Sequence, residues 1–199
     1  ITPHTSRAPA LPLGCAFTSS GAITNMRPDL FAGLAVVDIA PTNSAQVSSF
    51  VPYLEAMRGK LGLSTIEDND WPLIEQMWQL MQDNRLDFTL FFRSLSALEQ
   101  GGEPALYDLC LDRSTLVDWL TVYRNRLRRE PTDAEERATA MRQVNPKYVL
   151  RNHLAEQAIR QARQGVFTEI ERLMDCLSRP FDEQPQYEEY AALPPDWAG

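Results

Sequence analysis

Residues 145–152 read NPKYVLRN, and this stretch determines the fold predicted for the second half of the chain. Asn145 can cap a helix, because its side-chain oxygen can accept a backbone N–H. Pro146 suits the first helical position, where a missing N–H costs nothing. An apolar face follows at helical spacing, made of Val149, Leu150, Leu154, Ala158 and Ile159. The sequence therefore predicts a helix that begins at Asn145 and runs to Gly165.

The same helical spacing recurs through most of the chain from Ser48 onward. It predicts helices over Phe50–Leu61, Trp71–Met81, Phe88–Leu98, Leu116–Leu127 and Phe167–Leu177, and a short charged helix that ends at Met141. The predicted stops are Gly62, the Gly101-Gly102 pair, Pro131 and Pro180, and a loop containing Pro104 precedes Leu116.

Three helix starts carry capping signals. Ser64 with Glu67, and Thr132 with Glu135, have the spacing of a capping box, in which each side chain satisfies a backbone N–H of the other residue. Asp87 is positioned to cap the helix that carries Phe88. No β-hairpin signal and no fixed repeat follow Ser48, so the predicted fold is all-α, an irregular helical bundle.

The composition divides the chain into three regions. Residues 1–47 are rich in small and polar residues, lack sustained periodicity and are interpreted as a loosely ordered or aberrant leader. A frameshifted or misjoined coding region would also explain them, and Ile1 as first residue indicates a processed or internal start. Residues 48–180 form the helical domain. Residues 181–199 are predicted to be an extended, Pro-rich tail that lies over the surface.

Charge and cysteine content exclude several classes of function. The chain has 199 residues and a net charge of −8, which argues against nucleic acid as a partner. No apolar run approaches the roughly 20 residues of a membrane span. Cys15, Cys110 and Cys176 are widely spaced and His4 and His153 lack ligand partners at helical spacing, so we expect no metal site. The expected compartment is the cytoplasm of a bacterium, or the mitochondrion in a eukaryote.

The charged clusters have structural and functional interpretations. Acidic groups at Glu67-Asp68-Asn69-Asp70 and at Asp133, Glu135 and Glu136 stand at helix starts, where negative charge complements the helix dipole. The basic residues Arg124, Arg126, Arg128 and Arg129 end a helix, and they could also pair with the acidic surface of a partner domain. Arg151 either bridges to a carboxylate on a neighbouring helix or faces a nucleotide-binding domain. The aromatic and Met stripes are interpreted as core.

Six short motifs occur in a specific order. They are Met57-Arg58-Gly59-Lys60-Leu61-Gly62-Leu63, Asp87-Phe88-Thr89 with Phe92-Arg93, Trp119 with Tyr123 and Arg124, Arg137 with Met141, Asn145 to Asn152, and Pro194-Pro195-Asp196-Trp197. In this order, from Phe50 to Trp197, the chain resembles the C-terminal part of the selenoprotein O (SelO/YdiU-like) family.

The resemblance implies a kinase-like protein adenylyltransferase, which transfers AMP from ATP to protein Ser, Thr or Tyr hydroxyls with Mg or Mn. The family's ATP- and metal-binding residues belong to its N-terminal part, and no Gly-rich phosphate loop or kinase-type catalytic loop is present in this sequence. We therefore assign no catalytic, cofactor-binding or metal-binding residue to this chain, and no cofactor to this fragment.

Two functions remain open on this basis. In the first, the chain is a C-terminal fragment that buttresses the kinase-like catalytic domain of the same protein, and is inactive alone. In the second, it is a stand-alone, non-catalytic helical domain that binds another protein through an exposed apolar face. Its protein substrates are not identified by the sequence.

Overall fold

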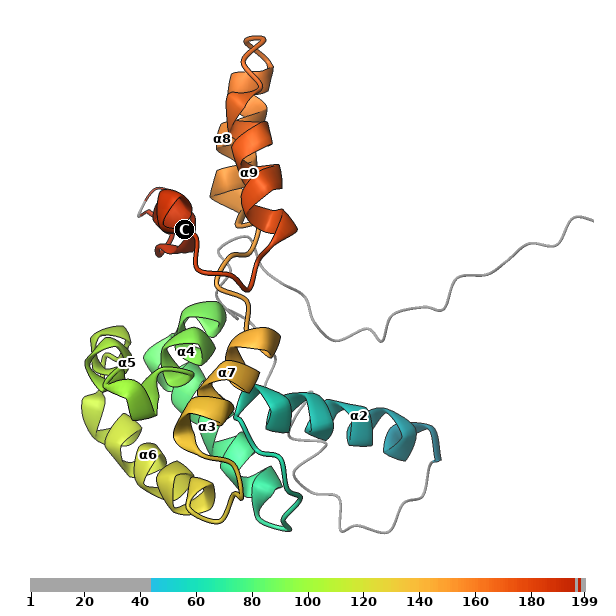
Figure 1. The fold of residues 1–199 in the computed structure, drawn as a ribbon, viewed down its shortest axis with the longest axis vertical. Helices are drawn as coiled ribbons and strands as arrows, with labels where there is room; N and C mark the ends of the chain where they lie inside the picture. Colours follow the sequence, from blue (N-terminus) through green and yellow to red (C-terminus); the bar gives the residue numbers. More distant parts are fainter. Residues whose placement is uncertain (1–43, 196, 198–199) are drawn as a thin grey trace, which may run out of the picture.

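The computed structural model describes residues 44–195 and 197 (Figure 1). The predicted leader, residues 1–47, lies outside this range except for its last four residues. In the described part the elements are helical, which confirms the all-α prediction. They are α2 (Ser44–Lys60), α3 (Asp70–Asn84), α4 (Phe88–Leu95), η1 (Leu98–Gln100), α5 (Glu103–Leu109), α6 (Arg113–Leu127), α7 (Ala134–Val144), α8 (Asn152–Ala162), α9 (Thr168–Ser178), η2 (Pro185–Tyr187) and α10 (Glu188–Ala191).

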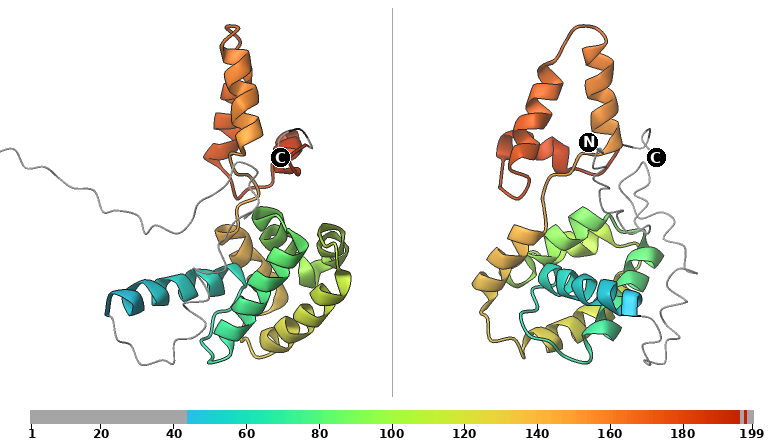
Figure 2. Two further views of the ribbon diagram at one scale, coloured as in Figure 1. Left: turned by 180° about the vertical axis from the view of Figure 1, so that it is seen from behind. Right: turned by 90° about the vertical axis from the view of Figure 1, so that its right-hand side faces the viewer.

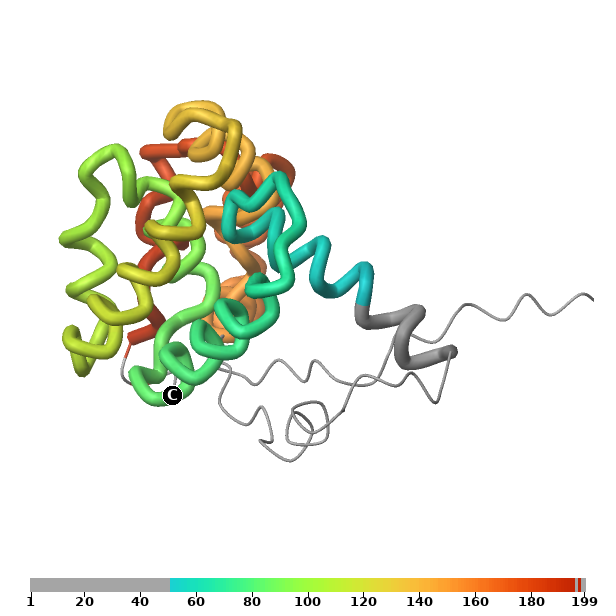
Figure 3. Tube along the Cα trace, turned by 90° about the horizontal axis from the view of Figure 1, so that it is seen from below, coloured from blue at the N-terminus to red at the C-terminus, as the bar shows by residue number. Residues whose placement is uncertain are grey.

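Helices α2 to α7 form the larger part of the molecule, here called the bundle (Figure 1). α3 packs on α6, α4 on α5 and α2 on α7. Seen from below, α3 to α7 form one group and α2 leads into it from the edge (Figure 3). The buried core of the bundle comprises Met57, Leu61, Leu63, Leu73, Ile74, Met77, Leu80, Met81, Leu86, Phe91, Phe92, Leu95, Leu98, Leu106, Leu116, Trp119, Leu120, Tyr123, Leu127 and Met141.

The centre of the bundle is aromatic and its polar atoms are satisfied. The rings of Trp119 and Tyr123 stack with centroids 4.9 Å apart. Trp119 Nε1 donates to the Leu73 carbonyl at 3.1 Å, and the Tyr123 hydroxyl donates to the Leu61 carbonyl at 2.7 Å. Each such side chain contributes about 1.5–3 kcal/mol through burial. The two hydrogen bonds also fix α6 against α2 and α3, as predicted for aromatic stripes that form the core.

Helices α8 to α10 form a second unit, here called the arm. α8 and α9 make a hairpin that projects from one end of the bundle, with η2 and α10 beside its base (Figures 1 and 2). The arm has its own small core of Tyr148, Leu154, Ala158, Leu173, Cys176, Tyr190 and Ala191. The predicted extended tail therefore contains two short helical elements, because Tyr190 and Ala191 pack into this core.

The helix predicted to begin at Asn145 begins seven residues later, at Asn152. Asn145 instead follows the end of α7, and its Nδ2 donates to the Lys60 carbonyl at 2.9 Å. The backbone N–H groups of Lys147 and Tyr148 both donate to the Pro180 carbonyl, at 2.8 and 3.1 Å. These tertiary bonds hold residues 146–151 out of a helix and outweigh the local preference that Asn145 and Pro146 express.

Both predicted capping boxes are wrong. The hydroxyl of Ser64 donates to Glu130, at 2.5 Å, and α3 begins only at Asp70. In α7 the cap is Asp133, whose carboxylate accepts from the backbone N–H groups of residues 135 and 136. The third prediction is confirmed, because the Asp87 carboxylate accepts from the Leu90 N–H at 2.9 Å.

Two further boundaries differ from the prediction. The helix after Asp87 ends at Leu95 rather than Leu98, and η1 follows it. The predicted loop around Pro104 is helix α5, which tolerates the proline because it stands in the first turn. None of the helices in the described part is long and apolar enough to cross a membrane.

Candidate functional site

The most buried charges of the molecule surround Arg126 on α6. Its Nε lies 2.7 Å from Asp70 Oδ1 and one terminal nitrogen lies 2.6 Å from Glu130 Oε1. The other terminal nitrogen donates to the Thr65 carbonyl at 2.9 Å. Asp70 also forms an ion pair with Arg58, whose Nε lies 2.8 Å from Asp70 Oδ2. We call Arg58, Asp70, Arg126 and Glu130 the charge cluster.

Glu130 shows how completely the charge cluster is satisfied. Burial by itself would raise the pKa of Glu130, but hydrogen bonds from Ser64 and Thr65 and the Arg126 guanidinium lower that pKa to about 2. The Asp70 pKa is also lowered, because bonds from Arg126, the Glu67 N–H and Arg58 outweigh the effect of burial. These carboxylates are therefore ionised and paired at neutral pH, an arrangement suited to holding the α2–α3 connection on the end of α6.

The acidic run at residues 67–70 and the basic run at residues 124–129 pair largely with each other and with Glu103. Asp70 is the first residue of α3, as the helix-start interpretation of the acidic run predicts. The basic run pairs within the chain: Arg124 lies 2.6 Å from Glu103, and Arg129 lies 2.8 Å from Glu67. Arg126 is almost completely buried. These three arginines thus pair with carboxylates of this chain.

Arg151, the N-cap residue of α8, reaches across to the bundle. Its two terminal nitrogens lie 2.6 and 3.1 Å from the carboxylate oxygens of Asp87, the cap of α4. Both side chains are buried. The prediction that Arg151 bridges to a carboxylate of a neighbouring element is confirmed. The rings of His153 and Trp197 are nearly perpendicular, with centroids 6.2 Å apart. Burial, and then the nearby Arg151 charge, lower the pKa of His153.

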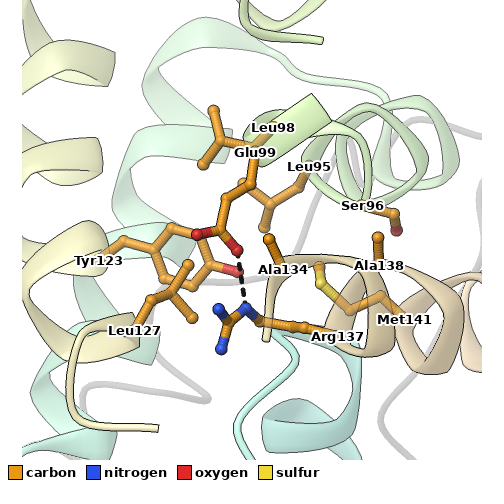
Figure 4. A pocket seen from close by; sticks show the side chains of 10 residues that line it. All are labelled: Leu95, Ser96, Leu98, Glu99, Tyr123, Leu127, Ala134, Arg137, Ala138 and Met141. Atoms are coloured by element: carbon orange, nitrogen blue, oxygen red, sulfur yellow. Dashed lines mark hydrogen bonds and ion pairs between the residues drawn. The ribbon is translucent and has the colours of Figure 1, made fainter. Parts of the chain in front are cut away.

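A small cavity lies between η1, α6 and α7 (Figure 4). Its volume is about 10 Å³, at the lower limit for one water molecule. Glu99 and Arg137 meet across it at 2.8 Å, and Tyr123, Leu127 and Met141 line its apolar side (Figure 4). The cavity is a packing gap and is far too small for a nucleotide.

The described cysteines have environments that suppress thiolate formation. Burial raises the pKa of the Cys110 thiol to about 11, and burial also raises the pKa of Cys176. Both are free thiols, and Cys15 lies outside the described residues. Within residues 44–195 and 197, no group of three or more His, Cys, Asp or Glu side chains is placed to hold a metal ion.

Sequence reasoning missed the residues that matter most at the end of α7. Arg93 of α4 donates to the carbonyls of Arg142 and Asn145, at 3.3 and 3.1 Å. Lys60 of α2 donates to the Val144 carbonyl at 3.3 Å and lies over the rings of Phe88 and Phe92.

The spacing of Arg126 and Glu130, four residues apart, was a signal in the sequence that could have indicated the charge cluster.

Comparison with known proteins gives a consistent result. Residues 43–178 match the sequence model of the family described as protein adenylyltransferase SelO. The chain is 49% identical over 175 residues to the protein nucleotidyltransferase YdiU of Burkholderia multivorans, covering 86% of this chain and 34% of the relative. It is 51% identical over 153 residues to the protein of the same name from Paraburkholderia xenovorans, covering 75% of this chain and 30% of the relative. The chain thus spans about a third of the length of these curated relatives.

Proposed function

This chain belongs to the SelO family of protein nucleotidyltransferases, and on that premise we propose that it is the C-terminal helical region of a SelO-type protein adenylyltransferase. The observation that carries the proposal is the family match over residues 43–178, which coincides with the bundle and most of the arm. The whole protein would transfer AMP from ATP to Ser, Thr or Tyr hydroxyls with Mg or Mn, in the cytoplasm.

Within that protein this region would act as a buttress for the kinase-like catalytic part. The internal pairing of its charges supports this role. Arg126 is buried and paired with Asp70, and Arg151 is buried and paired with Asp87, so neither guanidinium is free to bind phosphate. The described cavity between η1, α6 and α7 is too small for ATP. A helical region with internally paired arginines, and with a described cavity too small for ATP, fits a structural role.

Calorimetry with ATP and Mg, and a labelled-ATP transfer assay, test this proposal on the chain alone. The full-length Burkholderia multivorans relative serves as the active control. We expect no saturable binding at micromolar ATP and no labelled protein with the chain alone. Saturable micromolar binding, or labelling that disappears when a residue of this chain is substituted, would refute the buttress role.

A second function, a free-standing interaction domain, is favoured by one observation. Three apolar side chains of the α8–α9 hairpin, Ile159, Phe167 and Met174, are 51%, 56% and 69% exposed. Ile159 lies on α8, Met174 on α9 and Phe167 at the N-cap of α9, and the described residues leave all three largely uncovered. A size-exclusion experiment with the separately expressed N-terminal two-thirds of the Burkholderia relative distinguishes the two functions. Co-elution that is lost in a triple Ile159→Ser, Phe167→Ser, Met174→Ser variant supports the buttress, and independent elution supports the free-standing domain.

A further inference from the structure

The arm and the bundle are held together by polar contacts rather than by a shared core. The two sets of core residues have no member in common. Three apolar side chains near the connection, Val144, Leu150 and Phe181, are 44%, 56% and 40% exposed, and the buried Tyr148 belongs to the arm core. In Figures 1 and 2 the hairpin stands clear of the bundle in every view.

Two ion pairs carry the attachment. The first is the buried pair between Arg151 of the arm and Asp87 of the bundle. The second joins Arg93 of α4 to Glu183 at the base of the arm, with the atoms 2.5 Å apart. The Glu183 side chain is 62% exposed, so this second pair is open to solvent and screened by salt. We call these two pairs the latch.

Within two residues, the hydrogen bonds of the connecting segment switch from partners in the bundle to partners in the arm. Asn145 is bonded to the bundle, through Lys60 and Arg93. Lys147 and Tyr148 are bonded to the arm, through the Pro180 carbonyl. Tyr148 is also part of the arm core, and its hydroxyl donates to the Gln184 carbonyl at 2.9 Å. A rotation of the arm that preserves both sets of bonds must therefore occur in the backbone torsions between Asn145 and Lys147, of which φ of Pro146 is fixed by its ring.

The attached position leaves polar atoms unsatisfied. Arg151 Nε is buried and has no hydrogen-bond partner among the described residues. A buried donor without a partner costs about 1–3 kcal/mol, and solvent would satisfy it if the arm moved away. The ion pair itself also loses hydration in the attached position, which offsets part of its attraction. Both terms lower the net stability of the attached position.

We propose that the arm is a rigid unit that pivots at Pro146 between a latched and a released position, and that the latch sets the balance between them. Release breaks the Arg151–Asp87 and Arg93–Glu183 pairs and leaves both cores intact. The proposal goes beyond the buttress function and does not depend on catalysis. It concerns a conformational device within this chain.

Double electron–electron resonance on the 199-residue chain tests the pivot. A nitroxide attached to a non-natural amino acid at Gln76 of α3 reports the bundle, and another at Gln164 reports the tip of the arm; both positions are exposed. Latch variants are Arg151→Gln and Glu183→Gln. Arg172→Gln is the matched control, because Arg172 pairs with Glu189, at 2.6 Å, inside the arm. Circular dichroism confirms that each variant is folded.

We expect one dominant distance in the parent chain and in Arg172→Gln. In Arg151→Gln a second distance should appear, with the released-to-latched ratio raised at least about tenfold, as loss of a buried pair predicts. Glu183→Gln should shift the ratio less. It should also abolish most of the dependence of this ratio on NaCl between about 0.05 and 1 M, roughly the range over which the Debye length falls from more than 10 Å to 3 Å. A single unchanged distance in both folded latch variants would overturn the proposal. If Arg151→Gln fails to fold, the exposed Glu183→Gln variant alone decides the matter.

Discussion

At the scale of single residues, Gly62 adopts a backbone conformation that disfavours any side chain. It ends α2 with φ of +68°, a region that costs other residues about 1–2 kcal/mol. A Cβ added at Gly62 would lie 2.7 Å from Arg137 Cγ and 2.8 Å from Met141 Sδ. The glycine therefore permits both the turn after α2 and the close approach of α7.

Gly62→Ala should lower the free energy of unfolding by about 1–3 kcal/mol, through backbone strain and overlap with α7. Gly59→Ala is the matched control, because Gly59 lies inside α2 and a Cβ there meets nothing within 4 Å. That change should stabilise the chain by about 0.5–1 kcal/mol through helix propensity. Urea denaturation of both variants measures the two effects, and equal stabilities would contradict the account of Gly62.

Glu130 makes the stability of the bundle depend on acid. Its pKa is lowered to about 2 in the folded chain, against 4.5 ordinarily. A lowered folded-state pKa means that the carboxylate stabilises the fold above pH 4.5 and that this contribution is lost as the pH falls toward 2. The loss amounts to about 3 kcal/mol for a shift of this size.

Denaturation midpoints between pH 7 and pH 2 check this dependence. Glu130→Gln should be less stable than the parent at neutral pH and should lose less stability on acidification. Glu171→Gln, a change at an exposed position of α9, should follow the parent curve. An acid-dependence that survives unchanged in Glu130→Gln would show that other carboxylates carry it.

At the scale of elements, two neighbouring residues, Thr132 and Asp133, are candidates for the N-cap of α7. The Asp133 carboxylate accepts from two backbone N–H groups, at 2.9 and 2.8 Å. The Thr132 hydroxyl accepts only from the Arg137 side chain, at 3.2 Å. Asp133→Ala should cost about 0.5–2 kcal/mol, as loss of a cap does. Thr132→Ala should lower the free energy of unfolding by less than half as much. Thermal unfolding of the two variants measures the difference. A larger loss of stability in Thr132→Ala than in Asp133→Ala would support the capping box predicted from the sequence.

The sequence predicted which segments form helices more accurately than it predicted the first and last residue of each helix. The aromatic and Met stripes were predicted to be core. The structure buries Phe91, Phe92 and Trp119, but Phe167 and Met174 are 56% and 69% exposed, so the prediction is wrong for the last helix. Periodic burial is a property of a single helix, so the sequence of that helix is sufficient. The carboxylate that caps α4, Asp87, was also identifiable because its partner lies three residues away.

The errors occur where a distant residue competes for a local signal. Ser64 could have capped α3, but Glu130 binds its hydroxyl from 66 residues away in the chain. Asn145 could have capped a helix, but its side chain bonds to Lys60. The same limit applies to the candidate site. For Arg151 the sequence offered two alternatives, a bridge to a carboxylate or a face toward a nucleotide-binding domain, and only the folded chain identifies Asp87 as its partner.

At the scale of the whole molecule, the two cores differ in size and should differ in stability. The bundle core draws on most of α2 to α7, whereas the arm core consists of a few residues from α8, α9, α10 and the linker. Less apolar area is buried in the arm, so its stabilisation against unfolding is smaller. The polar attachment between them gives little reason for the two units to unfold together.

Native-state amide exchange should therefore show α8 and α9 opening before α3 and α6. Leu154→Ala, in the arm core, should cost about 2–5 kcal/mol through lost burial and a cavity, because Leu154 is only 4% exposed. That loss should speed exchange in the arm and leave α3 and α6 protected as before. Leu120→Ala, at a fully buried site of the bundle, is the converse control and should speed exchange in α3 and α6. If Leu154→Ala instead raises exchange equally in α3 and α6, the arm and the bundle form one cooperative unit, and both the pivot and the separate stabilities of the two cores are wrong.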